Sequence, residues 1–294
     1  MRKSRAASQT ARAKRPNDPR PRADFTIEQD WAAYTEEEHA VWRRLFRRQE
    51  KILRRRACSE FLDGLAGLGV AADGIPDFRR LNAILAARTG WTIVAVPGLV
   101  PDDIFFAHLS ARRFPSTCFI RRPEQLDYLE EPDIFHDVYG HVPMLMDPIF
   151  ADYMQAYGQG GLKALRLGSL DRLARLYWYT VEFGLIQTAS GLRIYGSGIV
   201  SSKGESVYAL ESAVPNRIGF DLLRVMRTKY RIDTFQATYF VINSFAQLFN
   251  ATQPDFTPYY DRMRGTDDIA PDVVLPGDVV LQRGKTNPVG ILPT

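Results

Sequence analysis

The sequence predicts a mainly α-helical protein of the α+β class, with a few short β-strands in one compact domain. Three observations support this fold class. The 294 residues are 45% hydrophobic and 24% charged, an ordinary composition for a chain that buries a substantial core. The long segments have apolar residues at helical spacing, whereas the strand-like segments are short. No internal repeat or low-complexity linker divides residues 25–265.

A long amphipathic helix is predicted to run from Thr35 to Leu65. Thr35 and Glu38 have the spacing of a capping box, and Trp42 and Phe46 begin an apolar stripe at helical spacing. The opposite face is dense in Arg and Lys, which is typical of a solvated surface. The other elements are expected as helices over residues 78–88, 147–166, 171–190 and 233–250, and as short strands near 91–97, 117–121 and 278–283.

Residues 1–24 are predicted to form a disordered basic tail. They hold eight Lys/Arg, two Asp, three Pro and no aromatic residue, so they cannot bury enough apolar surface to offset the entropy of ordering. Since this tail contributes +6 to the formal net charge of +4, the remaining chain carries −2, and no specific nucleic-acid partner is indicated. No signal peptide or membrane span is recognised, because the longest apolar run, residues 91–100, is short and interrupted by Pro97 and Gly98.

The remaining boundaries follow from composition. Residues 25–265 are expected to form the folded domain, and residues 266–294, rich in Pro, Gly and Asp, an irregular C-terminal extension. Cys58 and Cys118 are the only cysteines, which is too few for a disulfide framework or a cysteine-based zinc site. This composition favours a cytoplasmic location.

Two of the four histidines lie in one short stretch, EPDIFHDVYGHVP, residues 131–143. Neutral imidazole is the most common protein ligand for Zn, Fe, Cu and Ni, so the pair raises the question of a third ligand. On a regular helix His136 and His141 would lie roughly 140° apart, and a shared metal therefore requires a distorted helix. Gly140 loosens the backbone and Pro143 removes an amide donor, so the stretch contains a source of distortion.

Glu182 is the only charged residue between Leu176 and Leu192. On the helix predicted over residues 171–190 it is flanked by apolar side chains, so its carboxylate would point into apolar surroundings. A buried, unpaired carboxylate is unfavourable unless its pKa shifts until it is neutral. A metal ion would remove that cost, and so would a partner arginine or a route to solvent.

His136, His141 and Glu182 have the ligand types of a two-histidine, one-carboxylate facial triad, which suits non-haem Fe(II) and dioxygen. Zinc on the same ligands is the competing interpretation, as in hydrolases whose metal-bound water attacks a carbonyl. A metal-free amino acid binding module is a third hypothesis. Ligand types and spacing leave all three open.

At these residues the chain resembles the tetrahydropterin-dependent aromatic amino acid hydroxylases, most closely the compact bacterial phenylalanine 4-hydroxylases. The resemblance covers about 210 residues in the same order. The pairing of EPDIxHDxxGHVP with a later TVEFGL is far more specific than any single ligand spacing. The motifs are YTEEEHAVW (34–42), TGWTIVAVPGLV (89–100), IRRPEQLDYLEEPDIFHDVYGHVP (120–143), YWYTVEFGL (177–185), YGSGIVSSKGE (195–205) and TFQATYFVINSF (234–245).

The resemblance implies a single catalytic domain over residues 25–265 that holds ferrous iron through His136, His141 and Glu182. It implies L-phenylalanine as substrate, with the substrate carboxylate at Arg121, whose planar fork can bind a carboxylate bidentately. The other substrate-binding residues that it implies are Trp178, Phe183, Gly198, Ser201, Pro132 and Val241.

The resemblance also implies a tetrahydropterin, either tetrahydrobiopterin or a bacterial analogue. Phe105 matches the aromatic ring that stacks on the pterin, with Phe106 as the alternative because VPDDIFFAHLSAR differs from the animal enzymes. Lys203 stands where the animal enzymes have Phe, so the packing of the loop after Tyr195 is expected to differ. The remaining residues implied on the pterin side are Gly98, Val100, Asp137 and Tyr177.

The expected activity is a monooxygenase that converts L-phenylalanine to L-tyrosine with Fe(II), a tetrahydropterin and O2 as cosubstrate. Val241 stands where an apolar residue accompanies phenylalanine preference, and tyrosine or tryptophan hydroxylation within the same family is the alternative. The chain starts too close to the catalytic region for an amino-terminal regulatory domain and ends without heptads, so a monomer without substrate activation is expected. The expected partners are the substrate and the enzymes that recycle the pterin, with no specific nucleic acid and no membrane.

Overall fold

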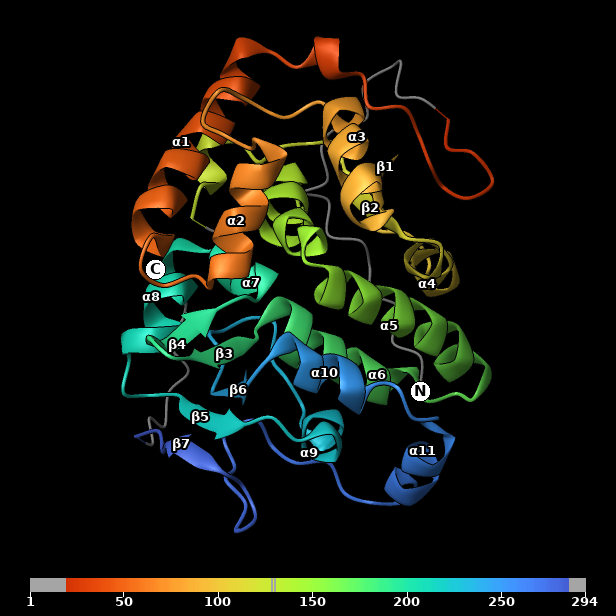
Figure 1. Cartoon of the computed structure of the whole chain (residues 1–294), viewed down its shortest axis with the longest axis vertical. Coiled ribbons are helices and arrows are strands. Elements are labelled where there is room, and N and C mark those ends of the chain that lie inside the picture. Colours follow the sequence, from red (N-terminus) through yellow and green to blue (C-terminus); the bar gives the residue numbers. More distant parts are fainter. Residues whose placement is uncertain (1–19, 128, 130, 286–294) are drawn as a thin grey trace.

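Helices dominate the structure, a computed structural model that describes residues 20–127, 129 and 131–285 (Figure 1). The predicted mainly helical α+β fold is confirmed. The α-helices are α1 (Glu36–Leu53), α2 (Ser59–Leu68), α3 (Phe78–Thr89), α4 (Asp102–Ser110), α5 (Pro148–Arg166), α6 (Leu170–Tyr177), α7 (Ser197–Val200), α8 (Lys203–Glu211), α9 (Leu222–Arg227), α10 (Phe245–Ala251) and α11 (Thr257–Met263). The 3-10 and π segments are η1 (Trp31–Ala33), η2 (Pro123–Gln125), η3 (Phe135–His141), η4 (Val142–Met146) and η5 (Trp178–Glu182).

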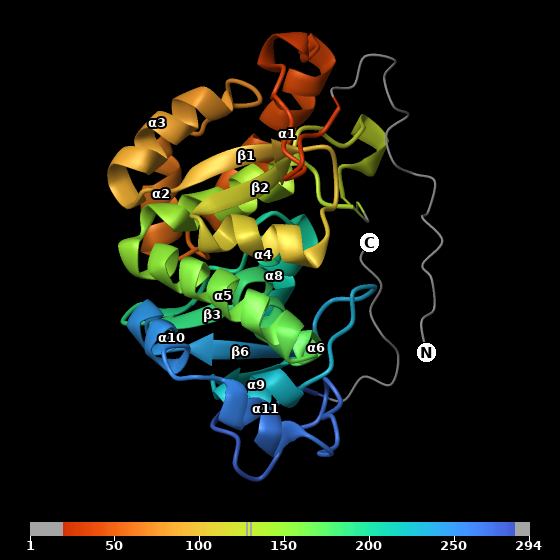
Figure 2. The same ribbon diagram turned by 90° about the vertical axis from the view of Figure 1, so that its right-hand side faces the viewer.

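Two sheets complete the fold. One is a parallel pair, β1 with β2. The other has five strands in the order β4-β3-β6-β5-β7, and in both views α5 crosses the molecule between the two sheets (Figure 1 and Figure 2). The strands are β1 (Thr92–Val96), β2 (Arg113–Thr117), β3 (Leu185–Thr188), β4 (Gly191–Ile194), β5 (Asn216–Gly219), β6 (Thr238–Ile242) and β7 (Val280–Gln282).

The helix predicted from Thr35 is interrupted, although its capping box is present. The Thr35 hydroxyl accepts a hydrogen bond from the Glu38 backbone, and the Glu38 carboxylate accepts one from the Thr35 backbone. The prediction of a single helix that continues to Leu65 was wrong, because α1 ends at Leu53 and α2 begins at Ser59. Between them the chain forms a parallel bridge from Ala57 to Ile194 at the outer edge of β4, and that pairing requires extended backbone.

Three other predicted elements differ from the structure. The strand expected near 117–121 lies at 113–117, the second half of the helix expected over 171–190 is strand β3, and the helix expected over 233–250 contains strand β6 before α10 begins. All five residues of β6 are buried at the centre of the larger sheet. A continuous apolar run of this kind fits a buried strand as well as a helix, so apolar spacing alone was insufficient.

The two ends of the chain are only partly described. The predicted tail, residues 1–24, lies mostly outside the described residues, but Asp24 at its boundary is anchored, with its carbonyl oxygen 2.8 Å from Nε2 of buried His108. In the predicted extension, residues 266–294, the chain is largely irregular up to residue 285, and β7 pairs antiparallel with β5. Residues 286–294 lie outside the described part.

An aromatic cluster holds η3 against the N-terminal helices. Phe135 and Tyr139, both on η3, stack with ring centroids 4.6 Å apart. Trp42 of α1 meets the Phe135 ring edge-on at 5.2 Å, and Phe61 of α2 meets the Tyr139 ring at 5.8 Å. These fully buried rings fix the position of η3, which carries both histidines of the HDVYGH motif.

Candidate metal centre

The two histidines lie on a π-helix, which explains how residues five apart converge. η3 spans Phe135–His141 in π geometry, whose i→i+5 hydrogen-bond period brings residues five apart to the same face. The expectation that a regular helix could not bring His136 and His141 together therefore holds, and the distortion is a full π turn. Asp133 caps its start, because the Asp133 carboxylate accepts a hydrogen bond of 3.0 Å from the His136 backbone.

Glu182 is the last residue of a second π-helix. η5 spans Trp178–Glu182, and the Phe183 backbone N–H donates to the Trp178 carbonyl, an i→i+5 bond of 2.9 Å. The prediction that the helix over residues 171–190 continues past Glu182 was wrong, because Leu185 already belongs to β3. The carboxylate is 14% exposed and points towards the histidines.

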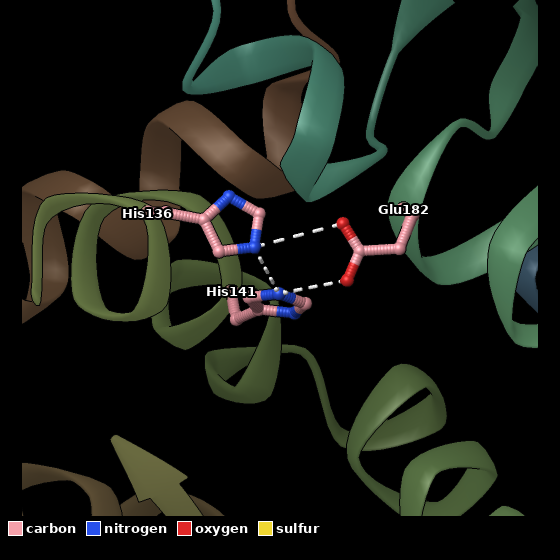
Figure 3. Close-up of side chains that lie close together, drawn as sticks. All are labelled: His136, His141 and Glu182. Carbon is pink, nitrogen blue, oxygen red and sulfur yellow. Dashed lines mark hydrogen bonds and ion pairs between the residues drawn. The ribbon is translucent and has the colours of Figure 1, made fainter. Parts of the chain in front are cut away.

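The three side chains point at one another (Figure 3). Nε2 of His141 lies 3.2 Å from Nε2 of His136 and 3.2 Å from Oε1 of Glu182, and Nε2 of His136 lies 3.6 Å from Oε2 of Glu182. Among the described residues, these three form the group of His, Cys, Asp and Glu whose ligand atoms all lie within 4.8 Å of one another. Metal bonds of about 2.1 Å at right angles would place neighbouring ligand atoms about 3 Å apart, which this arrangement approaches.

Ser201 fixes the tautomer of His136. The Ser201 hydroxyl donates to the Ser197 carbonyl at 2.7 Å, so it has no hydrogen left for the imidazole. Nδ1 of His136, 3.0 Å from Ser201 Oγ, must therefore be the donor in that contact. The lone pair of Nε2 then faces the other two ligand atoms, which is the arrangement that metal-binding histidines use.

Ser197 and Asp133 have roles that the sequence reading missed. Ser197, the first residue of α7, donates a hydrogen bond to Glu182 at 3.0 Å or to the Val181 carbonyl at 3.1 Å. Asp133 contacts both η3 and Arg121. Asp133 stands three residues before His136, the spacing of a helix cap, and that signal could have identified it. No comparable pattern in the sequence marks Ser197.

The charges of the centre are set by burial and by mutual contact. Burial acts to raise the pKa of Glu182, but adjacent His141 and His136 outweigh it and hold that pKa at about 2. Burial lowers the pKa of His136 to about 4, against the attraction of Glu182. At neutral pH the carboxylate is therefore anionic and the His136 imidazole neutral, which are the protonation states that bind a metal ion.

This donor set fits a single transition-metal ion. Two imidazole nitrogens and one carboxylate oxygen are directed at a common point, and a cation there would satisfy lone pairs that otherwise face one another. Three protein ligands on one side leave further coordination positions open, as non-haem Fe(II) oxygen chemistry requires. Zinc accepts the same three ligands, so geometry alone leaves both metals possible.

Comparison with known proteins decides the family. The family model for the biopterin-dependent aromatic amino acid hydroxylases matches residues 23–262. The chain belongs to this family. It is 65% identical over 263 residues to the phenylalanine-4-hydroxylase of Ralstonia nicotianae, covering 90% of this chain and 84% of that protein. It is 60% identical over 266 residues to the enzyme of the same name from Chromobacterium violaceum, covering 89% and 88%.

Solved structures of the hydroxylase family agree with the fold. The crystal structure of the Chromobacterium violaceum phenylalanine hydroxylase with iron and phenylalanine bound matches with a TM-score of 0.86 at 58% identity, covering 90% of this chain and 96% of that one. The cobalt-bound structure of the same protein matches with a TM-score of 0.88 at 60% identity. The family uses a pterin and iron, so iron and tetrahydropterin chemistry applies to this hydroxylase chain.

Arg121 is buried next to η3 in a bidentate ion pair. Its Nε and Nη2 donate to the two oxygens of Asp133, each at 2.8 Å, and its backbone N–H donates to Asp133 at 2.9 Å. The remaining nitrogen, Nη1, has a weak contact of 3.4 Å with the Leu126 carbonyl. One edge of the guanidinium is thus committed to Asp133, and the other is available to a second anion.

Trp178, Phe183 and Gly198 lie together beside Glu182. The Trp178 and Phe183 rings are 4.7 Å apart at 39°. A Cβ on Gly198 would lie 2.9 Å from the Phe183 ring and 3.1 Å from the Glu182 carbonyl, so only glycine allows α7 to approach this closely. The structure therefore brings these three hydroxylase-motif residues to the metal centre, along with Ser201.

The recorded contacts of Val241 and Pro132 are with residues outside the candidate metal centre. Val241 is buried in β6, opposite Leu185 of β3, and it also lines a separate cavity of about 630 Å³ bounded by β5, α9 and the C-terminal residues. Pro132 directly precedes Asp133, and its carbonyl accepts a hydrogen bond of 3.2 Å from Thr117. The contact of each with a substrate stays a prediction.

The Asp137 side chain contacts Thr117 at the end of β2. One carboxylate oxygen accepts bonds from the backbone N–H of Thr117 at 2.7 Å and from its hydroxyl at 2.9 Å. Burial raises the pKa of Asp137 to about 7, even though both Thr117 contacts act to lower it. The carboxyl group next to His136 is therefore near its titration point at neutral pH.

Of the two candidates for the stacking ring, Phe105 is the more accessible. Phe106 is 4% exposed and packs so closely on α5 that a Cβ on Gly161 would overlap its ring. Phe105 is partly buried and meets the Tyr177 ring edge-on at 6.1 Å. Tyr177 in turn stacks on His141 at 6.2 Å, so Phe105 and Tyr177 extend from the metal centre towards the surface.

Gly98 and Val100 follow β1 in a loop near Glu131. A Cβ on Gly98 would lie 3.2 Å from a carboxylate oxygen of Glu131, and Val100 is half-buried. Within the part of the chain that the structure describes, no helix combines the length and the apolar character needed to cross a membrane.

Proposed function

We propose that this protein hydroxylates L-phenylalanine to L-tyrosine, using ferrous iron, a tetrahydropterin and dioxygen. The observation that carries the proposal is the convergence of His136, His141 and Glu182 on one point, in a chain of the pterin-dependent family. Its relatives at 60% and 65% identity are named phenylalanine-4-hydroxylases. Bound iron and tetrahydropterin together supply the activation of dioxygen that an aromatic C–H bond requires.

The protein's first task is to hold the metal with open positions. Two imidazoles and one anionic carboxylate would hold one side of a bound ion, and its other side would face the residues assigned to substrate and pterin. Ser201 keeps Nε2 of His136 deprotonated, and Ser197 orients the Glu182 carboxylate. These contacts preorganise the ligands before the metal binds.

The second task is to orient the amino acid. The free edge of Arg121 is proposed to take the substrate carboxylate, while Asp133 holds its other edge. Because Asp133 also caps η3, the substrate anchor and the metal-bearing helix share one buried carboxylate. The substrate's position relative to the metal is thereby fixed through a single rigid contact.

The third task is to enclose the reacting rings and exclude water. Trp178 and Phe183 are proposed to pack on the phenylalanine ring, with Pro132, Gly198 and Ser201 completing the pocket and Val241 favouring phenylalanine over tyrosine. Phe105 is proposed to stack on the pterin. Asp137, Tyr177, Gly98 and Val100 are proposed to line the rest of the pterin site.

We further propose that the enzyme acts as a cytoplasmic monomer and that separate reductases recycle its pterin. Cys58 and Cys118 are not joined in a disulfide, and Cys58 is buried, which suits a reducing compartment. Sedimentation of the purified protein would test the monomer. A Hill coefficient clearly above one for phenylalanine would contradict the absence of substrate activation.

Metal-stripped protein provides the test of function. It is reloaded anaerobically with Fe(II) or Zn(II), mixed with phenylalanine with and without tetrahydropterin, and then exposed to oxygen. Tyrosine is expected only with Fe(II) and pterin together, and tyrosine and tryptophan assayed as competing substrates define the preference. Turnover of an ester or amide by the Zn(II) form alone would overturn the proposal.

A further inference from the structure

We propose that Gln236, held by Glu205, is a positioning residue that sets the orientation of the Trp178 indole and thereby the affinity for the substrate ring. The inference deepens the proposed function and rests on it, because it takes Trp178 to be a wall of the substrate pocket. Neither Gln236 nor Glu205 belongs to the metal centre or to the residues that the sequence motifs mark for substrate or pterin.

The loop between α9 and β6 holds the Trp178 indole at two points. The indole Nε1–H donates to Oε1 of Gln236 at 2.9 Å. Tyr230, on the same loop, stacks on the indole with centroids 4.3 Å apart at 16°. Phe183 covers the indole at 4.7 Å, so the ring has little freedom to turn.

The amide of Gln236 has one workable orientation. Oε1 faces the indole N–H, and Nε2 donates to the Arg231 carbonyl at 3.2 Å. The reversed amide would set its NH2 group against the indole donor and its oxygen against a carbonyl acceptor. Gln236 is only 4% exposed, so water could not repair either mismatch and the amide keeps the indole in place.

Glu205 of α8 fixes the backbone of Gln236. Its Oε1 accepts a bond of 3.2 Å from the Gln236 N–H and a short bond from the Tyr239 hydroxyl. Glu205 is 4% exposed, and no arginine or lysine pairs with it among the described residues. A buried carboxyl group without a counter-ion is costly, and here both of its hydrogen bonds serve the segment that carries Gln236.

The same segment is packed tightly on the start of α8. A Cβ on Gly204 would lie 2.7 Å from the Phe235 ring, and Phe235 lies 4.9 Å from Tyr208. Since α8 follows α7, which ends next to Ser201, the support of the indole and the support of His136 come from adjacent helices. Trp178, the proposed wall of the substrate pocket, and the candidate metal ligand His136 are thus supported by neighbouring helices.

The test compares Gln236→Leu with Gln29→Leu. Gln29 is the control because its side-chain amide likewise accepts one N–H, here from the Phe78 backbone at 2.7 Å. It donates to one carbonyl, of Pro76 at 3.1 Å, and it lies near the N-terminal segment. Gln236→Leu is expected to raise the KM and the equilibrium dissociation constant for phenylalanine about fivefold, the effect of one lost hydrogen bond. Iron content and kcat should change by less than about twofold, and Gln29→Leu should leave all four quantities unchanged.

A double-mutant cycle identifies the indole as the route of the effect. Trp178→Phe removes the N–H donor, so adding Gln236→Leu to it should raise the KM no further. Should Gln236→Leu not fold, Gln236→Asn, which stays polar but is one methylene too short to reach the indole, replaces it throughout.

The outcomes separate two failures. An unchanged KM in Gln236→Leu, or a parallel loss of iron and of thermal stability, would overturn the positioning role while wild-type tyrosine formation stands. Equal effects of Gln236→Leu in the wild-type and Trp178→Phe backgrounds would also overturn it. Absence of tyrosine formation by wild-type protein would instead overturn the proposed function itself.

Discussion

Two buried arginines in this molecule have nearly the same surroundings and differ in one respect. Arg121 pairs with Asp133 beside η3, and Arg224 pairs with Asp278 at the far end of the larger sheet. Each guanidinium lies over a phenylalanine ring, at 5.9 and 5.6 Å. All three nitrogens of Arg224 make bonds within the chain, including 2.5 Å bonds from Nη1 to Thr228 and from Nη2 to the Val273 carbonyl, whereas Nη1 of Arg121 has only its 3.4 Å contact.

This difference in donor use supports the proposed binding role of Arg121 and a structural role for Arg224. Burial and ion pairing are the same at both sites, so neither identifies function. The weakly engaged Nη1 edge of Arg121 supports its proposed role, because a buried N–H with only a 3.4 Å contact gains more when a ligand supplies a better acceptor. Substitutions on the metal-centre side of the molecule should therefore change binding, and matched substitutions elsewhere should change stability.

Removal of a metal ligand should have the largest effect. His136→Ala or Glu182→Ala leaves two ligands, and iron affinity is expected to fall by far more than about 100-fold, with loss of tyrosine formation. His108→Ala is the control, because His108 is also shielded from solvent but contacts the Asp24 carbonyl. Iron per chain after dialysis is the measurement. Retention of iron by both ligand variants would remove the proposed centre.

Replacement of Arg121 and Arg224 by lysine should have different effects, on the KM for phenylalanine at Arg121 and on stability at Arg224. Arg121→Lys keeps a charge beside Asp133 but loses the fork, so the KM for phenylalanine is expected to rise at least about tenfold with little change in iron content. Arg224→Lys should leave that KM unchanged and lower the free energy of unfolding by about 2–4 kcal/mol, since it leaves buried acceptors unpaired. Steady-state kinetics and urea unfolding of both variants provide the comparison, and a KM effect at Arg224 would contradict it.

The adjacent residues Phe105 and Phe106 of α4 should also differ, with an effect on pterin binding at Phe105 and on stability at Phe106. Phe105→Ala is expected to raise the KM for tetrahydropterin about fivefold through loss of one stacked ring. Phe106→Ala should instead lower the free energy of unfolding by about 3–5 kcal/mol, because its ring fills the space against Gly161. The reverse result would exchange the roles of the two rings.

The last expected effect is a pH dependence at Glu205. Burial raises the pKa of Glu205 to about 7, above the 4.5 of an exposed glutamate. The folded state therefore binds the Glu205 proton more tightly than the unfolded state does. Its contribution to the free energy of unfolding is fully present below about pH 4.5 and is lost as the pH rises through about 7. The free energy of unfolding of Glu205→Gln, relative to that of the wild type, should rise by about 2–3 kcal/mol between pH 5 and pH 8. A difference that is constant with pH would contradict this.

The sequence predicted the fold class and the helices with clear amphipathic spacing, such as α3 and α5. It mistook β6 and β3 for helix, because a run such as TYFVI is buried on all sides and carries no period. It also missed the end of α1 near Leu53, where pairing with distant Ile194 overrides a continuous helical pattern. These errors share a cause, since tertiary contacts between distant residues determined the local structure.

At the site, the candidate ligands came from residue types, and their geometry came from the structure. The spacing of His136 and His141 excluded a regular helix but did not identify a π turn, which depends on packing rather than on composition. The hydrogen bond from His136 to Ser201 and the Gln236 contact with Trp178 join residues 65 and 58 apart, beyond the reach of local patterns. Assignments to substrate and pterin stay predictions.

The connection between α1 and α2 has a consequence for association between molecules. Arg56 accepts a backbone bond from Ile194 and Cys58 donates one back to it, at 2.8 and 2.9 Å. An open border of β-structure offers unpaired amides and carbonyls on which a neighbouring chain can polymerise. Here residues 56–58 of the same chain pair with Ile194 at the end of β4, so the interruption between α1 and α2 also blocks part of this edge from pairing with another molecule.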